Sequence, residues 1–210
     1  MKLNDFKVVL ASGSPRRLEI LEGDGIEPLV LRPGCSEDIH LDLSPAQTVM
    51  ALALRKGLDA EKLPAEGKAP FEVPDGSFVI ISSDTIVHKD GKIYGKPESS
   101  EEAAAMLKSL RNACHQVYSG VFLNIKGMGV RLLFCDKTDV YVGDFTDDWL
   151  DAYVHSGEPF DKAGGYAIQG AFGCNIDHIE GAYDNVVGLP LEKIKRMLEG
   201  VTAAPQGIGR

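Results

Sequence analysis

Two adjacent arginines stand where the first turn of a helix is expected. The sequence LASGSPRR at 10–17 places Ser12 and Ser14 before a proline, which Arg16 and Arg17 follow. Each positive charge at this end of a helix opposes the helix dipole, at a cost of about 0.3–1 kcal/mol. A bound anion would offset that cost, because backbone N–H groups, hydroxyls and guanidinium groups would converge on it. The pattern favours phosphate; the alternative is an ordinary loop whose arginines point into solvent.

Further charged residues lie beside glycines or at the ends of expected elements. The cations are Arg16, Arg17, Lys56, Lys96 and Lys162, and the acids are Glu37, Asp84 and Asp161. Carboxylate oxygens are the ligands that Mg²⁺ or Mn²⁺ needs when the metal also carries the phosphates of a substrate. Together the two sets predict a site in which cations and a metal neutralise a triphosphate.

Asp84 has the clearest position among the acids. It comes just after the apolar run FVII at 78–81, and we expect it at the end of a buried strand, where α/β proteins place ligands. The alternative role for Asp84 is to cap a turn. Taken singly, Lys96 is better interpreted as an ordinary surface lysine, and the alternative for Asp161 with Lys162 is a solvated pair.

Hydrophobic patterns place strands around these residues. Short strands are expected at 8–11, 27–32, 78–81, 167–168 and 176–179. Residues 86–88 and 92–94 predict a hairpin around Asp90 and Gly91, and the long runs 115–126 and 130–142 predict another. The glycine-rich segment 158–173 is otherwise expected to form a loop-rich wall around the site.

Capping residues mark the starts of the helices. Ser14, Ser44, Ser99 and Thr146 occupy N-cap positions, and Glu102 completes a capping box with Ser99. The helices are expected from Pro15, from Ser44 to about Leu58, from Ser99 with helical spacing up to Leu110, from Thr146 to His155, and from Pro190 to Glu199. Residues 59–77 predict a long surface loop, and 201–210 a disordered tail after a single domain over 1–200.

Composition excludes several classes of partner. The chain has 210 residues, a net charge of −9 and 44% hydrophobic residues, which is ordinary for a soluble globular protein. An acidic balance argues against a nucleic-acid polymer or an anionic membrane as a partner. The four scattered cysteines suit free thiols in a reducing compartment, and no apolar stretch approaches the length of a membrane span, so we expect a cytoplasmic protein.

Several blocks in order give the chain a specific resemblance to a known family. They are LASGSPRR at 10–17, SDT at 83–85, GKP at 95–97, EEAAAMLKSL followed by HQVYSGV, PFDKAGGYAIQG at 159–170 and NVVGLPL at 185–191. With these blocks the chain resembles the Maf family of nucleoside triphosphate pyrophosphatases. The departures are Ser83 and Gly165, where alanine is common, and a longer 59–77 loop.

The resemblance implies a fold, a reaction and roles for residues. The implied fold is an elongated, two-lobed, mixed-sheet α/β fold similar to inosine triphosphatase, with the active-site cleft between the lobes. Members hydrolyse nucleoside triphosphates between the α and β phosphates and commonly form homodimers. By motif, Asp84 looks like the general base and a metal ligand, and Glu37 and Asp161 look like further ligands of Mg²⁺ or Mn²⁺. The implied substrate contacts are Ser12, Ser14, Arg16, Arg17, Lys56, Thr85, Lys96, Lys162 and Gln169.

Three positions imply which base is accepted. At the positions of Arg16, Thr85 and Gln169 the chain resembles the branch of the family that acts on dTTP and UTP, and differs from the branch that acts on 7-methyl-GTP. Gln169 offers both a donor and an acceptor, which suits the edge of uracil or thymine. The alternative is that Gln169 only forms hydrogen bonds with the backbone of its own loop.

The competing class of protein is a non-catalytic nucleotide-binding regulator of cell division. A kinase-like phosphoryl transferase is disfavoured, because the chain lacks a Walker loop and the kinase motifs.

Overall fold

The computed structural model describes residues 2–63, 66–72 and 76–203, and it confirms the predicted mixed α/β fold. In these residues seven strands form one sheet in the order β2-β1-β3-β5-β6-β7, with β4 paired to β3. The strands are β1 (Lys7–Ala11), β2 (Leu29–Leu31), β3 (Phe78–Lys89), β4 (Lys92–Tyr94), β5 (Ala113–Lys126), β6 (Val130–Val142) and β7 (Ile176–Glu180). β1 runs parallel to β2 and β3, whereas the other pairs are antiparallel.

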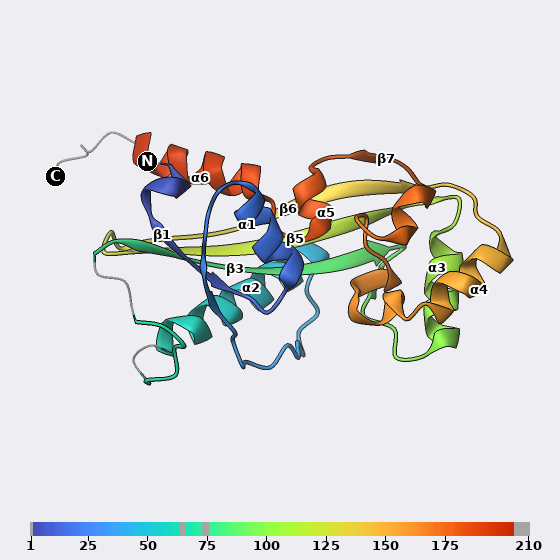
Figure 1. Ribbon diagram of the computed structural model, residues 1–210, viewed down its shortest axis with the longest axis horizontal. Helices are drawn as coiled ribbons and strands as arrows, with labels where there is room; N and C mark the ends of the chain where they lie inside the picture. The colour runs from blue at the N-terminus through green and yellow to red at the C-terminus, as the bar shows by residue number, and fades with distance from the viewer. Residues whose placement is uncertain (1, 64–65, 73–75, 204–210) are drawn as a thin grey trace.

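Helices cover the sheet in two groups (Figure 1). The α-helices are α1 (Pro15–Gly23), α2 (Pro45–Lys62), α3 (Ser100–Leu110), α4 (Asp147–His155), α5 (Tyr183–Val187) and α6 (Leu191–Ala203). Short 3₁₀ helices lie at Leu3–Asp5, Glu158–Asp161, Ala163–Gly165 and Ala171–Asn175. At one end α1 and α6 lie on one side of the long strands and α2 on the other, while α3 and α4 lie at the far end. None of the helices within the described ranges has the length and hydrophobicity of a membrane span.

Separate hydrophobic cores hold the two ends. Near the termini, Leu10 of β1 packs with Leu21 and Leu198 of the helices on one face, and Val9 packs with Ala60 of α2 on the other. Because both faces of β1 are buried, its sequence is a continuous apolar run rather than an alternating one. At the far end α3, α4 and the distal halves of β5 and β6 pack around the buried Phe172. The elongated sheet therefore carries two lobes.

One long strand replaces two predicted short ones. The prediction of a strand ending at 81 and a separate arm at 86–88 was wrong, because β3 is continuous from Phe78 to Lys89. On one side, β1 pairs with residues 78–82 of β3 and β4 pairs with 87–89. Residues 83–86 have no strand partner on that side within the described residues. Asp84 therefore lies in the middle of its own strand but just beyond the end of the neighbouring β1.

Other boundaries also differ from the sequence expectations. α2 extends to Lys62, so 59–62 are helical rather than part of the loop, and α6 continues to Ala203. Residues 167–168 form no strand. Ser99 caps α3 as predicted, but the Glu102 carboxylate accepts from the Glu98 N–H instead of closing a capping box. Parts of the expected loop and tail, 64–65, 73–75 and 204–210, lie outside the described residues.

Two glycines allow α2 to lie directly against the sheet. A Cβ atom on Gly120 of β5 would stand 2.3 Å from the Val49 carbonyl carbon, and one on Gly57 would stand 2.1 Å from the Phe122 ring. Between these contacts the Ser82 hydroxyl donates to the Ala53 carbonyl at 2.7 Å. The backbone of α2 is thereby fixed against the middle of β3 and β5.

We expect Gly120→Ala to lower the free energy of unfolding by about 1–3 kcal/mol or more, because the new methyl group overlaps helix backbone that cannot rotate away. Gly23→Ala is the control, since a Cβ atom at Gly23 would have no neighbour within 4 Å and the φ of Gly23 is not positive. That change should leave stability equal or slightly higher. Urea denaturation of both variants checks this, and equal stabilities would contradict the close packing of α2.

Candidate active site

A cleft of about 680 Å³ opens where β3 lacks a strand partner. Its walls come from the start of α1, from α2 and from the 186–188 segment in one lobe, and from the β3–β4 hairpin and 161–169 in the other. All twelve predicted site residues line this cleft: Ser12, Ser14, Arg16, Arg17, Glu37, Lys56, Asp84, Thr85, Lys96, Asp161, Lys162 and Gln169. The volume is that of a typical small-molecule site.

Lys56 joins two of the predicted acids on the α2 side. Its Nζ lies 2.6 Å from Asp84 Oδ1 and 2.8 Å from Glu37 Oε1. The Asp84 and Lys56 side chains are only 10% and 14% exposed, whereas Glu37 is 65% exposed, so solvent screens the inner ion pair less. The hydrogen bond from Lys56 lowers the pKa of Glu37. Asp84 Oδ2 accepts no hydrogen bond from the described residues.

Asp161 belongs to a different group of charges. It pairs with Lys162 and, at 3.5 Å, with Arg16 of α1, so this contact joins the two lobes across the cleft. Burial acts to raise the pKa of Asp161, but the Lys162 hydrogen bond and the two positive charges outweigh it, and the pKa is lowered. Lys162 also donates to the Glu158 carbonyl at 2.6 Å.

The three predicted metal ligands do not form one ligand set. Within the described residues, no group of three or more His, Cys, Asp or Glu side chains is arranged to hold a metal ion. Glu37 and Asp84 converge on Lys56, while Asp161 is occupied by Arg16 and Lys162. Two converging carboxylates nevertheless fit Mg²⁺ or Mn²⁺, which proteins commonly hold with one or two carboxylates and the phosphates of a substrate.

Arg17 is buried, and each of its three guanidinium nitrogens donates a hydrogen bond to a protein atom. Its Nε donates to the Gly188 carbonyl at 2.8 Å, Nη1 to Ser12 Oγ at 3.1 Å and Nη2 to Thr85 Oγ1 at 3.1 Å. Burial lowers the pKa of Arg17, and the charge of Asp84 acts in the opposite direction. Arg17 therefore fixes the groups around the cleft, whereas Arg16 keeps a partly exposed guanidinium at its mouth.

The start of α1 is open to the cleft. Ser14 occupies the predicted N-cap position, but its side chain makes no capping hydrogen bond; its N–H donates instead to Ser12 Oγ at 3.1 Å. The backbone N–H groups of a first helical turn have no partners within the helix. This end of α1 therefore offers free donors beside Arg16.

Lys96 and Gln169 are two cleft residues whose long polar side chains have no partner among the described residues. Both are exposed, and neither makes a hydrogen bond or ion pair within the described part of the chain. The loop carrying Lys96 is anchored, because the Gly164 N–H donates to the Gly95 carbonyl at 2.9 Å. One charged and one amide side chain are thus held at the cleft without a protein partner.

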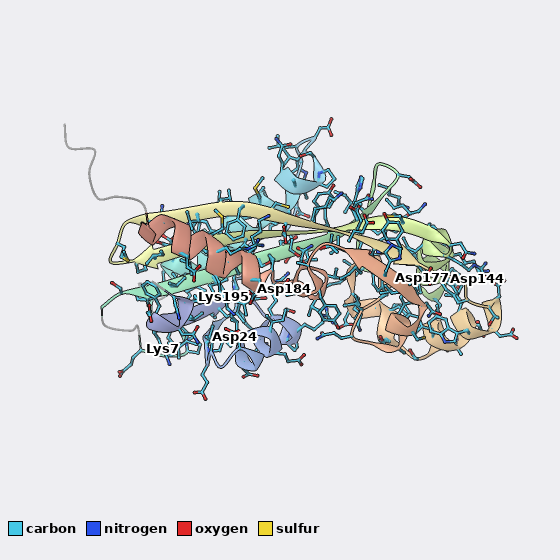
Figure 2. All side chains as sticks on the ribbon, turned by 90° about the horizontal axis from the view of Figure 1, so that it is seen from above. Lys7, Asp24, Asp144, Asp177, Asp184 and Lys195 are labelled. Atoms are coloured by element: carbon cyan, nitrogen blue, oxygen red, sulfur yellow. The ribbon has the colours of Figure 1, made fainter. Side chains whose placement is uncertain are left out.

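The Gly188 carbonyl is a site feature that the sequence did not identify. This carbonyl accepts hydrogen bonds from Arg17, Ser83 and Thr85. The N–H of Gly188 donates to the Asp184 carbonyl at 3.0 Å. The Asp184 carboxylate, labelled in Figure 2, accepts from the N–H of Glu192 in α6 and so anchors the turn. The block NVVGLPL marked this segment, but its residue types do not predict that a backbone carbonyl in it accepts hydrogen bonds from site residues.

A buried histidine supports the opposite wall of the cleft. His115 Nε2 lies 2.5 Å from the hydroxyl of Tyr166, which lines the cleft, and His115 Nδ1 has no hydrogen-bond partner within the described residues. Burial lowers the pKa of His115 to about 4, so its ring is neutral near pH 7. Nothing in the sequence distinguished His115 from the other four histidines.

Fold and cleft together define an α/β protein with a cleft between two lobes that is lined by charged residues. The family model described as "Maf-like protein" matches residues 7–201, and the chain belongs to this Maf family.

Curated relatives match along nearly their whole length. A "dTTP/UTP pyrophosphatase" of Caldicellulosiruptor saccharolyticus is 40% identical over 193 residues, 92% of this chain and 94% of the relative. One of Bacillus thuringiensis subsp. konkukian is 39% identical, with the same two coverages. Among solved structures, the Ham1 protein of Staphylococcus aureus matches with a TM-score of 0.41 and 14% identity, over 93% of this chain and 99% of that one.

The neighbouring arginines should differ sharply in their effect on stability. Arg17→Met should lower the free energy of unfolding by about 3 kcal/mol or more, because hydrogen bonds to a charged group contribute about 1.5–3 kcal/mol each. Arg16→Met should change it by less than about 1 kcal/mol, because its ion pair is partly exposed. Denaturant unfolding of both variants measures this, and equal losses would refute the assignment of Arg17 as the buried anchor.

Proposed function

We propose that this protein is a nucleoside triphosphate pyrophosphatase that converts dTTP and UTP into the nucleoside monophosphate and pyrophosphate. The observation that carries the proposal is the position of Asp84, held beside Lys56 in a cleft that also contains the open start of α1 and the free Lys96. Relatives named dTTP/UTP pyrophosphatase, aligned over 92% of the chain, support the same reaction.

The triphosphate binds at the charged end of the cleft. The free N–H groups of α1 and the partly exposed guanidinium of Arg16 hold phosphate oxygens, and Lys96 on the facing loop neutralises further charge. Lys162 stands beside them, oriented by Glu158 and Asp161. Arg17 stays with its protein partners and positions Ser12 and Thr85 instead of binding phosphate itself.

Asp84 acts as the general base. In the nucleotide-free protein its Oδ1 is held by Lys56, whereas Oδ2 has no hydrogen-bond partner among the described residues and can accept a proton from water. The water oxygen forms a bond to the α-phosphorus, the bond from that phosphorus to the bridging oxygen breaks, and its electron pair leaves with pyrophosphate. Glu37 and Asp84 would hold Mg²⁺ or Mn²⁺, which when bound with the nucleotide neutralises charge on the phosphates.

The apolar part of the cleft receives the base. Its apolar lining is formed by Leu52, Ile86, Val87, Ile93, Val117, Ile168, Val186 and Val187. Gln169, free of protein partners, can present its amide to the edge of uracil or thymine. The Thr85 hydroxyl is already bonded to Arg17 and Ser119, so Thr85 influences selectivity through the position of Arg17.

With dTTP and Mg²⁺ the protein should release dTMP and pyrophosphate in equal amounts, and Asp84→Asn should reduce turnover by roughly 10²–10⁴-fold, the usual contribution of a positioned general base. Asp148→Asn, an exposed acid of α4 away from the cleft, is the control and should keep full activity. Product chromatography with a pyrophosphate assay measures both. Production of dTDP with phosphate, or no turnover by the unmodified protein, would contradict the proposal; the latter would favour a non-catalytic nucleotide-binding regulator.

We expect kcat/KM for dTTP and UTP to exceed that for 7-methyl-GTP by at least about tenfold, because a mismatched base edge leaves buried polar groups unpaired. Gln169→Glu should narrow this ratio, since a carboxylate loses the amide donor and favours the donor-rich edge of guanine. Steady-state kinetics with the three nucleotides test both statements. An unchanged ratio in the variant would place the base elsewhere in the cleft.

A further inference from the structure

Lys56 occupies the space between two carboxylates of the cleft. Its ammonium group lies 2.6 Å from Asp84 and 2.8 Å from Glu37, so one positive charge bridges α2, β3 and the 32–44 segment. Of the three predicted metal ligands, Glu37 and Asp84 lie close enough together for their oxygens to share one cation. Lys96, another lysine of the cleft, forms no ion pair with a carboxylate within the described residues.

The base of the Lys56 side chain is fixed. The next residue, Gly57, packs against the Phe122 ring so closely that a Cβ atom would overlap it, and Ser82 bonds the Ala53 carbonyl one turn earlier. With its backbone held and only 14% of its side chain exposed, Lys56 has little freedom to leave the two acids unless another partner replaces them.

We propose that Lys56 is a built-in counter-ion that occupies the divalent-cation position while no nucleotide is bound, so that metal enters together with the nucleotide. The inference rests on the proposed function, and it assigns Lys56 a positioning role beyond contact with phosphate. An ammonium group bonded to both carboxylates repels a divalent cation and blocks their oxygens. Nucleotide phosphates offer Lys56 an alternative anionic partner, which frees the carboxylates for the metal.

This arrangement couples two binding events. If nucleotide draws Lys56 away from Glu37 and Asp84, nucleotide raises metal affinity, and by linkage metal raises nucleotide affinity by the same factor. Without nucleotide the protein should bind metal weakly, despite two acids close together. Removing the charge of Lys56 should therefore strengthen metal binding even where it weakens catalysis.

The test measures Mn²⁺ binding to the full chain without nucleotide. The concentration of free Mn²⁺ is monitored by electron paramagnetic resonance. Lys56→Gln should bind Mn²⁺ at least about tenfold more tightly than the unmodified protein, because the competing charge is gone. Lys56→Arg, which keeps the charge, should bind as weakly as the unmodified protein. Lys96→Gln is the matched control for the loss of one cleft charge and should tighten binding by less than about threefold.

Two further results complete the test. Adding Asp84→Asn to Lys56→Gln should abolish the gain, because the proposed ligand is then neutral. Equal tightening in the Lys56→Gln and Lys96→Gln variants, or no tightening in Lys56→Gln, would overturn the proposal. Either result can be obtained while the unmodified protein still releases pyrophosphate from dTTP, so failure of this inference is distinct from failure of the proposed function.

Discussion

The unbroken pairing of β3 with β5 is the constraint on which the cleft depends. The register runs from Phe78 opposite Lys126 to His88 opposite Gln116, and it places Asp84 directly opposite Gly120. Residues opposite each other in an antiparallel pair project to the same face. Because Gly120 has no side chain, the backbone of α2 reaches that face, and α2 carries Lys56 to within 2.6 Å of Asp84. One strand pairing and one missing Cβ thus position the central ion pair.

The two faces of β3 carry different charged groups. On its α2 face, Asp84 and Lys56 face the cleft for chemistry, whereas on the other face Ser83 and Thr85 bond the Gly188 carbonyl together with Arg17. The repulsion between the α1 dipole and its two arginines is thereby offset in different ways. The buried charge of Arg17 is stabilised by hydrogen bonds to neutral acceptors, and Arg16 is paired with Asp161 from the opposite lobe. The cleft thereby keeps a positive end.

The sequence predicted the fold class and the set of cleft residues, because motif blocks and hydrophobic periodicity both mark them. It could not predict that β3 is continuous, since its polar centre interrupts the apolar run; Ser82 and Ser83 are buried there only because the Ala53 and Gly188 carbonyls accept from them. The burial of Arg17 was equally hidden, because its acceptor lies 171 residues away. Local patterns carry no information about such distant partners. The roles assigned to the cleft residues stay predictions.

The central claim is that the triphosphate lies between the start of α1 and the Asp84–Lys56 pair. The most direct measurement is a crystal structure of the Asp84→Asn variant with dTTP and Mg²⁺. We expect phosphate oxygens on the first-turn N–H groups of α1 and beside Lys96, with the α-phosphorus facing residue 84 and the base near Gln169. A nucleotide bound in the opposite direction, with its base at α1 and its phosphates at Gln169, would contradict the claim.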